Sequence, residues 1–133
     1  MTPPITYFVP GTPAPQGSKR YVGNGRMIES SKKVKPWRQA VATHAKRHLQ
    51  NPLDGAVSLD ITFIMPRPKA WGRQRQDPMT QRPDIDKLLR STLDGLTGVA
   101  LVDDSQVTHL TAMKRRARRD EPTGAWITLK ETP

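Results

Sequence analysis

The stretch Val57-Ser58-Leu59-Asp60-Ile61-Thr62-Phe63-Ile64-Met65 decides the class of fold. Apolar residues stand at every second position from Val57 to Met65, which is the period of a strand that turns one face toward a core. We therefore expect a β-strand here, and with it a sheet that the flanking segments must extend and cover.

Upstream of this strand, a short β-rich run gives way to a loop. Ile5 to Val9 is interpreted as a strand, and Pro10 to Gly25, which is rich in proline and glycine, as a loop. Gly23-Asn24-Gly25 is typical of a tight turn, and Arg26 to Ile28 are expected to return as a short strand.

A helix is expected between that turn and the Val57–Met65 strand. Ser30 or Ser31 would cap it, Pro36 would lie near its first turn, and Asn51-Pro52 would end it. The apolar stripe at helical spacing consists of Val34, Trp37, Val41, Ala45 and Leu49.

Downstream of the strand, residues 66–83 form a long basic loop in which only Asp77 is acidic. A loop of this length inside a small domain is usually functional or disordered. A second helix is expected from Asp86 to Leu96, with Gly95 and Gly98 marking its end. Its buried face would hold Leu88, Leu89, Leu93 and Leu96.

Two further strands are expected near the end of the chain, from Gln106 to about Arg116 and from Ala125 to Lys130, joined by Glu121-Pro122-Thr123-Gly124. The whole pattern predicts a single domain over residues 1–133. Its class would be α+β, with a small mixed or antiparallel sheet and two helices.

The composition predicts a small core and excludes several kinds of function. Only 35% of the residues are hydrophobic, so a second subunit could help to complete the core. The absence of cysteine excludes disulfides, zinc–thiolate sites and cysteine nucleophiles. No apolar run approaches the roughly 18 residues of a membrane span, and Met1-Thr2-Pro3-Pro4 is unlike a secretory signal. A cytoplasmic protein without a membrane partner is expected.

The charge is distributed unevenly along the chain. The net charge is +10, yet the segment 84–104 holds five acidic and two basic residues, so it carries 2 − 5 = −3 and the remainder carries +13. A basic surface attracts a polyanion, which an acidic pocket would repel unless a divalent cation lay between them. This pattern favours metal-dependent chemistry on nucleic acid. The alternative is a solvated acidic helix and turn.

The acidic segment has a regular spacing. Asp84 and Asp86 lie on one side of an extended chain, and Asp86 would stand at or near the N-cap of the second helix. Arg90 follows Asp86 by four residues and can flank it. Asp94 lies about 12 Å from Asp86 along the helix, too far to share a metal ion, and is expected to pair with Arg90.

A second pair of carboxylates, Asp103 and Asp104, follows the apolar run 99–102. Alone it would be interpreted as a turn between a helix and a strand. All four carboxylates could converge on one pocket if the strand after Asp104 lay beside the start of the second helix. Oxygen-only ligands suit magnesium or manganese, and such a site could activate water against a phosphodiester.

Two other motifs are weaker. Residues 11–19 faintly resemble a P-loop, but Pro13 and Pro15 lack the backbone donors that a phosphate cradle uses, so no nucleotide cofactor is expected. His44 and His48 have the spacing of zinc ligands, but no glutamate follows His44, and both are interpreted as part of a basic helix face.

Three segments, in this order, resemble the RusA family of Holliday-junction resolvases. They are Arg82-Pro83-Asp84-Ile85-Asp86-Lys87-Leu88-Leu89-Arg90, Leu93-Asp94-Gly95-Leu96 and Val102-Asp103-Asp104-Ser105-Gln106-Val107. In addition, Gly11 to Trp37 looks like the phage-borne members of the family, although a phage and a chromosomal origin both remain open.

The resemblance implies a homodimeric, magnesium-dependent endonuclease that cuts four-way DNA junctions symmetrically, with manganese as a possible substitute. It implies catalytic and metal-binding roles for Asp84, Asp86 and Asp104, with Asp103 as a further metal-ligand candidate. The functional lysine of the family stands here as Arg90, which keeps the charge but cannot donate a proton near neutral pH. Stabilisation of transition-state charge is its expected role.

The DNA-contacting residues are expected among the basic clusters. They are Lys19, Arg20, Lys32, Lys33, Lys35, Arg73, Arg75, Lys87, Lys114, Arg115 and Arg116. Two other functions stay open beside a junction resolvase: a catalytically weak or inactive DNA-binding protein of the same fold, and a general structure-specific nuclease for flaps or forks.

Overall fold

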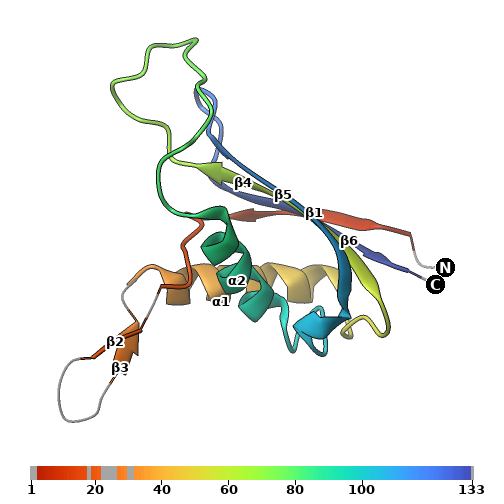
Figure 1. Cartoon of the computed structure of the whole chain (residues 1–133). Coiled ribbons are helices and arrows are strands. Elements are labelled where there is room, and N and C mark those ends of the chain that lie inside the picture. Colours follow the sequence, from red (N-terminus) through yellow and green to blue (C-terminus); the bar gives the residue numbers. More distant parts are fainter. Residues whose placement is uncertain (1–2, 18, 22–26, 30–31, 133) are drawn as a thin grey trace.

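The computed structural model describes residues 3–17, 19–21, 27–29 and 32–132. Two helices, α1 (Val34–His48) and α2 (Ile85–Leu96), lie on one side of a four-stranded sheet with the order β1-β6-β4-β5 (Figure 1). The strands are β1 (Ile5–Pro10), β4 (Val57–Met65), β5 (Val107–Arg116) and β6 (Gly124–Glu131). The expected α+β class with two helices is confirmed.

The strand that decided the fold lies at the centre of the sheet. β4 pairs parallel with β5 and antiparallel with β6, so the sheet is mixed. Its alternating residues Val57 to Met65 are all buried, as the period of two predicted. Ile64, which breaks the alternation, is buried as well. The other three strands of the sheet lie within two residues of their predicted bounds.

Helix α1 packs its apolar stripe into the core as expected, with Val34, Trp37, Val41, Ala45 and Leu49 all buried. The prediction of a serine N-cap was wrong, because the helix begins at Val34 and its N-cap is Lys33, which makes no side-chain cap bond. Ser30 and Ser31 lie outside the described residues, as does the turn expected at residues 23–25.

Helix α2 crosses α1 at Gly95. A Cβ atom on Gly95 would lie 2.9 Å from both the Arg38 carbonyl oxygen and the Val41 Cβ. The indole Nε1 of Trp37 donates to the Thr92 hydroxyl across the same interface, at 3.1 Å. Gly95 lies one residue before the end of α2, where the end of the helix was predicted, and close packing requires glycine there. Gly98, with φ +88°, does belong to the turn that follows.

Two shorter strands, β2 (Lys19–Tyr21) and β3 (Met27–Glu29), pair antiparallel outside the main sheet. The prediction placed β3 within one residue but interpreted β2 as loop. The proline- and glycine-rich surroundings hide a strand of three residues, which is too short to show an alternation.

The long basic loop, residues 66–83, extends from the end of β4 and connects to α2. It rises beyond the sheet together with the β5–β6 connection, residues 117–123 (Figure 1). Among the described residues, neither helix has the length and apolar character needed to cross a membrane.

Candidate active site

The first pair of carboxylates lies at the start of α2. Asp84 is the N-cap of the helix, with φ −69° and ψ 142°, and Asp86 lies inside the first turn. Asp86, which was predicted at or near the N-cap, therefore lies two residues after it. Neither carboxylate is buried, and Asp84 Oδ2 lies 3.8 Å from Lys87 Nζ. The helix dipole favours negative charge at this end.

The backbone before Asp84 is held by β5. Lys114 on β5 donates from Nζ to the carbonyl oxygens of Gln81, at 2.8 Å, and Pro83, at 2.9 Å. The Lys114 bonds fix the position at which Asp84 leaves the loop and the helix begins. The loop after β1 packs along the middle of α2, where Ser91 Oγ donates to the Ala14 carbonyl at 2.6 Å.

The second pair follows the turn after α2. Asp103 caps a short 3₁₀ helix, Asp104–Gln106, and its Oδ1 accepts from the Ser105 backbone N–H at 3.3 Å. Gln106 anchors this turn, because its Oε1 accepts from the N–H groups of Val102 and Asp103. Its amide nitrogen donates to the Leu53 and Gly55 carbonyls, which ties the turn to the chain before β4.

The two neighbouring carboxyls titrate differently. The Ser105 backbone N–H, followed by the Asp104 side chain, lowers the pKa of Asp103. The contact with Asp103 raises the pKa of Asp104, and a smaller contribution comes from the negative charge of Asp94. Of the pair, Asp104 is therefore the carboxyl that holds a proton more readily.

Asp104 also lines a hollow of about 590 Å³ between α1 and the end of α2, together with Lys35, Arg38 and Asp94. Asp94 Oδ2 lies 3.8 Å from Arg38 Nη1, which also donates to Gln16 Oε1. The expected Asp94–Arg90 pair is not formed, because α1 brings Arg38 to Asp94. Sequence spacing within one helix could not reveal this partner from another helix.

Helix α2 separates the two pairs of carboxylates. Its 12 residues span about 18 Å, with Asp84 and Asp86 at one end and Asp103 and Asp104 past the other. β5 lies beside the start of α2 at Lys114, which is close to the C-terminal end of the strand. Asp104 comes before the N-terminal end of the same strand. The strand after Asp104 thus does pass the helix start, but at its far end, so it does not bring Asp104 to Asp84 and Asp86 within one chain. Among the described residues, no three acidic or histidine side chains lie close enough to hold a metal ion.

Comparison with known proteins assigns the chain to a family. The family model described as "Endodeoxyribonuclease RusA" matches residues 10–129, which is most of the chain. The chain belongs to the RusA family. It is also similar to the uncharacterized protein YqaN of Bacillus subtilis (strain 168), with 30% identity over 122 residues, covering 83% of this chain and 86% of that protein. Membership in the RusA family supports a nuclease that acts on DNA.

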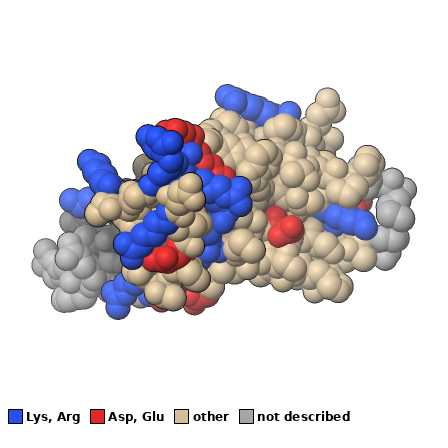
Figure 2. All heavy atoms as spheres, turned by 90° about the horizontal axis from the view of Figure 1, so that it is seen from above, with Lys and Arg blue, Asp and Glu red and all other residues tan. Residues whose placement is uncertain are grey.

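The structure of this RusA-family chain places the expected DNA-contacting residues in three groups. Lys32, Lys33 and Lys35 are exposed around the start of α1, and Lys87 lies beside Asp84. The remaining described ones belong to the long loop, residues 66–83, and to the end of β5. For Lys19 and Arg20, the structure describes only the backbone. In the view of Figure 2, most of the visible lysine and arginine lie toward one end of the molecule, and a few lie elsewhere.

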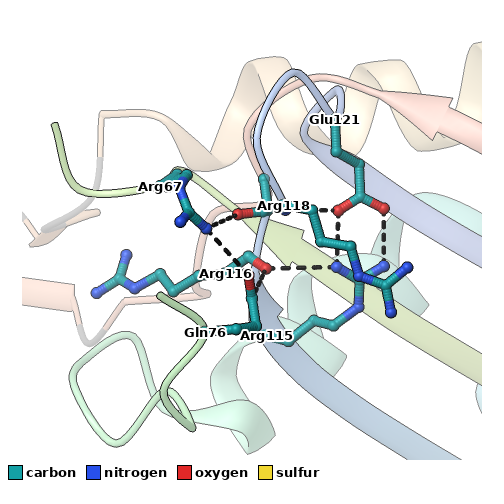
Figure 3. A network of polar contacts seen from close by, with 7 residues as sticks. Arg67, Gln76, Arg115, Arg116, Arg118 and Glu121 are labelled. Carbon is teal, nitrogen blue, oxygen red and sulfur yellow. Dashed lines mark hydrogen bonds and ion pairs between the residues drawn. The ribbon is translucent and has the colours of Figure 1, made fainter. Parts of the chain in front are cut away.

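Some of these cations are already engaged within the protein. Arg115 makes a two-pronged ion pair with Glu121, at 2.7 and 2.8 Å (Figure 3). Arg116 Nη1 donates to the Pro66 carbonyl at 3.0 Å. Arg115 lowers the pKa of Glu121 to about 2, so this pair is charged at neutral pH. The assignment of individual DNA-binding and metal-binding residues stays a prediction.

Proposed function

We propose that this protein is a metal-dependent endonuclease that resolves four-way DNA junctions by paired, symmetric cuts. The observation that carries the proposal is the match to the RusA family across residues 10–129. Two features of the chain agree with it: the strongly basic charge outside segment 84–104, and exposed carboxylates within that segment.

The carboxylates proposed to act in cleavage are Asp84, Asp86 and Asp104, with Asp103 as a further metal ligand. The proposed cofactor is magnesium, for which manganese could substitute, because all four side chains offer hard oxygen ligands. A divalent cation would supply charge stabilisation at the scissile phosphate. In one chain, however, these residues do not form a three-ligand group among the described residues.

Arg90 is proposed to stabilise the charge that develops on the phosphate. It is exposed on α2, one turn after Asp86, and takes part in no ion pair within the described part of the chain. Its guanidinium can therefore reach DNA without breaking an internal contact. The fork of N–H donors suits the two oxygens of a phosphodiester.

The working unit is proposed to be a twofold symmetric dimer. Resolution of a junction into intact duplexes needs two matched cuts in strands of like polarity, and twofold symmetry supplies two equivalent sites. Because α2 lies between the two carboxylate pairs of one chain, a site that uses both pairs would need one pair from each copy. Light scattering should then give twice the chain mass of 14.9 kDa.

The decisive experiment uses a labelled mobile four-way junction with and without magnesium. Symmetric cuts that require magnesium are expected, with a fork, a flap and a plain duplex cut far more slowly. Equal cutting of forks or flaps would favour a general structure-specific nuclease. Tight binding without any cutting would favour a DNA-binding protein that has lost activity.

A mixing experiment tests whether the two copies share a site. Asp84→Asn and Asp104→Asn proteins should each be inactive alone. If each site combines both chains, a heterodimer of the two variants has one site without any substitution and one with both, so it should nick junctions. If each chain builds its own site, both sites of the heterodimer are damaged and no nicking should return.

A further inference from the structure

The long basic loop and the neighbouring segment 114–121, which comprises the end of β5 and the start of the β5–β6 connection, hold most of the excess positive charge. The arm, residues 66–83, has five basic residues and one acidic residue, so its net charge is 5 − 1 = +4. The segment 114–121 adds five basic and two acidic residues, 5 − 2 = +3. Together these two segments carry +7, whereas the whole chain carries +10.

The arm is stabilised from inside by Arg67. Its Nη2 donates to the carbonyl oxygens of Gly72 and Arg75, both at 2.6 Å, and its Nη1 donates to the Ala117 carbonyl at 3.1 Å. The guanidinium carbons of Arg67 and Arg75 lie 5.2 and 5.1 Å from the Trp71 ring centroid, within cation–π range. The folded shape of the arm therefore depends on these cations.

Further polar contacts join the arm to the neighbouring loop, residues 117–123. Gln76 accepts from Arg67 Nη1 at 3.0 Å and donates to the Arg116 carbonyl at 2.7 Å (Figure 3). On the other loop, Glu121 binds Arg115 and accepts from the Arg118 backbone N–H at 2.8 Å. The two loops consequently form one connected unit, and Arg67, Arg75, Arg115 and Arg116 serve as its internal contacts.

A different set of cations faces the space between the loops. Arg73 and Arg119 both line two open hollows there, of about 430 and 420 Å³. Lys69 lines the first hollow and Arg118 the second. Arg73 and Lys69 take part in no ion pair within the described residues, and the Arg119–Asp120 contact is long, at 4.0 Å.

We propose that these hollows are a preformed binding site for backbone phosphates of DNA, gripped by Arg73 from one loop and Arg119 from the other, with Lys69 and Arg118 beside them. This inference rests on the proposed function, because it takes DNA as the substrate. Guanidinium groups suit phosphate oxygens in a two-pronged geometry. The internal bonds of the two loops order them before binding, which lowers the entropy lost when DNA binds.

The proposal divides the arginines of this region into two classes with different behaviour. Arg73 and Arg119 contact phosphate, so their loss should weaken DNA binding and its dependence on salt. The variant Arg73→Gln/Arg119→Gln tests this, and Lys46→Gln/Arg47→Gln is its matched control. The control removes the same two positive charges from exposed positions at the end of α1.

Binding to a synthetic four-way junction is measured by fluorescence anisotropy, without divalent metal, over a series of salt concentrations. Each lost phosphate contact removes about 0.9 from the slope of log affinity against log salt. The Arg73/Arg119 variant should lose about 2 from this slope and about tenfold or more in affinity at physiological salt. The control should keep the slope of the original protein, and both variants should keep its melting temperature.

Equal losses of affinity and slope in the variant and its control would overturn the proposal. The conservative variant Arg73→Lys/Arg119→Lys should keep the slope, because it keeps both charges. A different result would reject the proposed function itself: the original protein would not cut junctions in the presence of magnesium. Junction cutting with no special effect at Arg73 and Arg119 would instead reject the phosphate site alone.

Discussion

At the scale of single residues, the exposed carboxylates Asp84, Asp86 and Asp104 are the most direct test of the proposed chemistry. Asn at any one of these positions should reduce cleavage by about a hundredfold or more, because it removes a charged oxygen ligand. Junction binding should persist or tighten, since repulsion of phosphate falls. Gel assays of cutting and of binding separate the two effects, and Asp54→Asn, at an exposed position before β4, serves as the control. Two variants with full activity would refute the assignment.

Arg90 gives a second test at this scale. Arg90→Ala should raise the barrier of the cutting step by about 3 kcal/mol if the guanidinium stabilises developing charge. Arg90→Lys should remain active, because it keeps the charge. Single-turnover cutting rates, measured with enough protein to bind all of the junction, report on the cutting step alone. Comparing them with the binding affinity distinguishes this role from a contact that only helps to bind DNA. An alanine variant that cuts at the original rate would remove Arg90 from the proposed site.

The partners of single residues were only partly predictable. The sequence placed Arg90 and Asp94 one turn apart, which is a sound reason to expect an ion pair. The structure pairs Asp94 with Arg38 instead, because the glycine at position 95 lets α1 approach α2 closely. A contact between two helices depends on their crossing, and spacing along one helix carries no information about it.

At the scale of elements, the crossing of α1 and α2 depends on Gly95. Gly95→Ala would place a methyl group 2.9 Å from the Arg38 carbonyl and the Val41 Cβ, and neither neighbour is the free end of a flexible side chain. The free energy of unfolding should fall by about 1–3 kcal/mol. Gly72→Ala meets nothing within 4 Å and should change it by about 0.5 kcal/mol or less. Urea denaturation of both variants checks this comparison.

The β5–β6 connection should be sensitive to acid through Glu121. Arg115 and the other groups around Glu121 lower its pKa from 4.5 to about 2, so the folded state favours the charged form. The resulting stability is fully present above about pH 4.5 and is lost as pH falls toward 2. The melting temperatures of the original protein and Glu121→Gln should differ at pH 7 and converge near pH 2. Asp120→Asn, next to it in the same loop, should show no such convergence.

The elements themselves were largely predictable, because most of them show a period. β4 alternates over nine residues and α1 carries five apolar residues at helical spacing, so both were found. The short strand β2 has too few residues to show a period. The cap of α1 was misplaced because a serine near the helix start is a general preference, and Lys33 takes that position without any side-chain bond.

At the scale of the whole molecule, the sequence could list the carboxylates but not their arrangement. The four carboxylates could meet in one pocket only if Asp104 lay beside the start of α2. Which residues lie there depends on the order and direction of the strands. The observed order puts β5 at the sheet edge, parallel to β4, with Lys114 rather than Asp104 beside Pro83. In the proposed dimer, a second copy of the chain would have to bring its carboxylates to this end of α2.

A twofold dimer should make both cuts within one binding event. On a supercoiled plasmid with an extruded cruciform, the first nick releases the superhelical strain that keeps the junction formed, so a slow second cut would leave nicked circles. We expect linear product with little nicked circle, measured by gel electrophoresis over time. Accumulation of nicked circles only, by a protein that scatters light as a monomer, would contradict the paired mechanism.

The two bonds of Lys114 have a mechanical consequence. They fasten the Gln81 and Pro83 carbonyls to β5 at the point where the arm ends, and Asp84 is the next residue. If DNA binds the arm as proposed, these bonds would hold the last residues of the arm, and Asp84 directly after them, in a fixed position relative to β5. DNA binding by the arm and cleavage near Asp84 would then both depend on the contacts of Lys114. A DNA strand bound in the wrong position on the arm would also be misplaced relative to Asp84, so the scaffold itself would discriminate between DNA shapes.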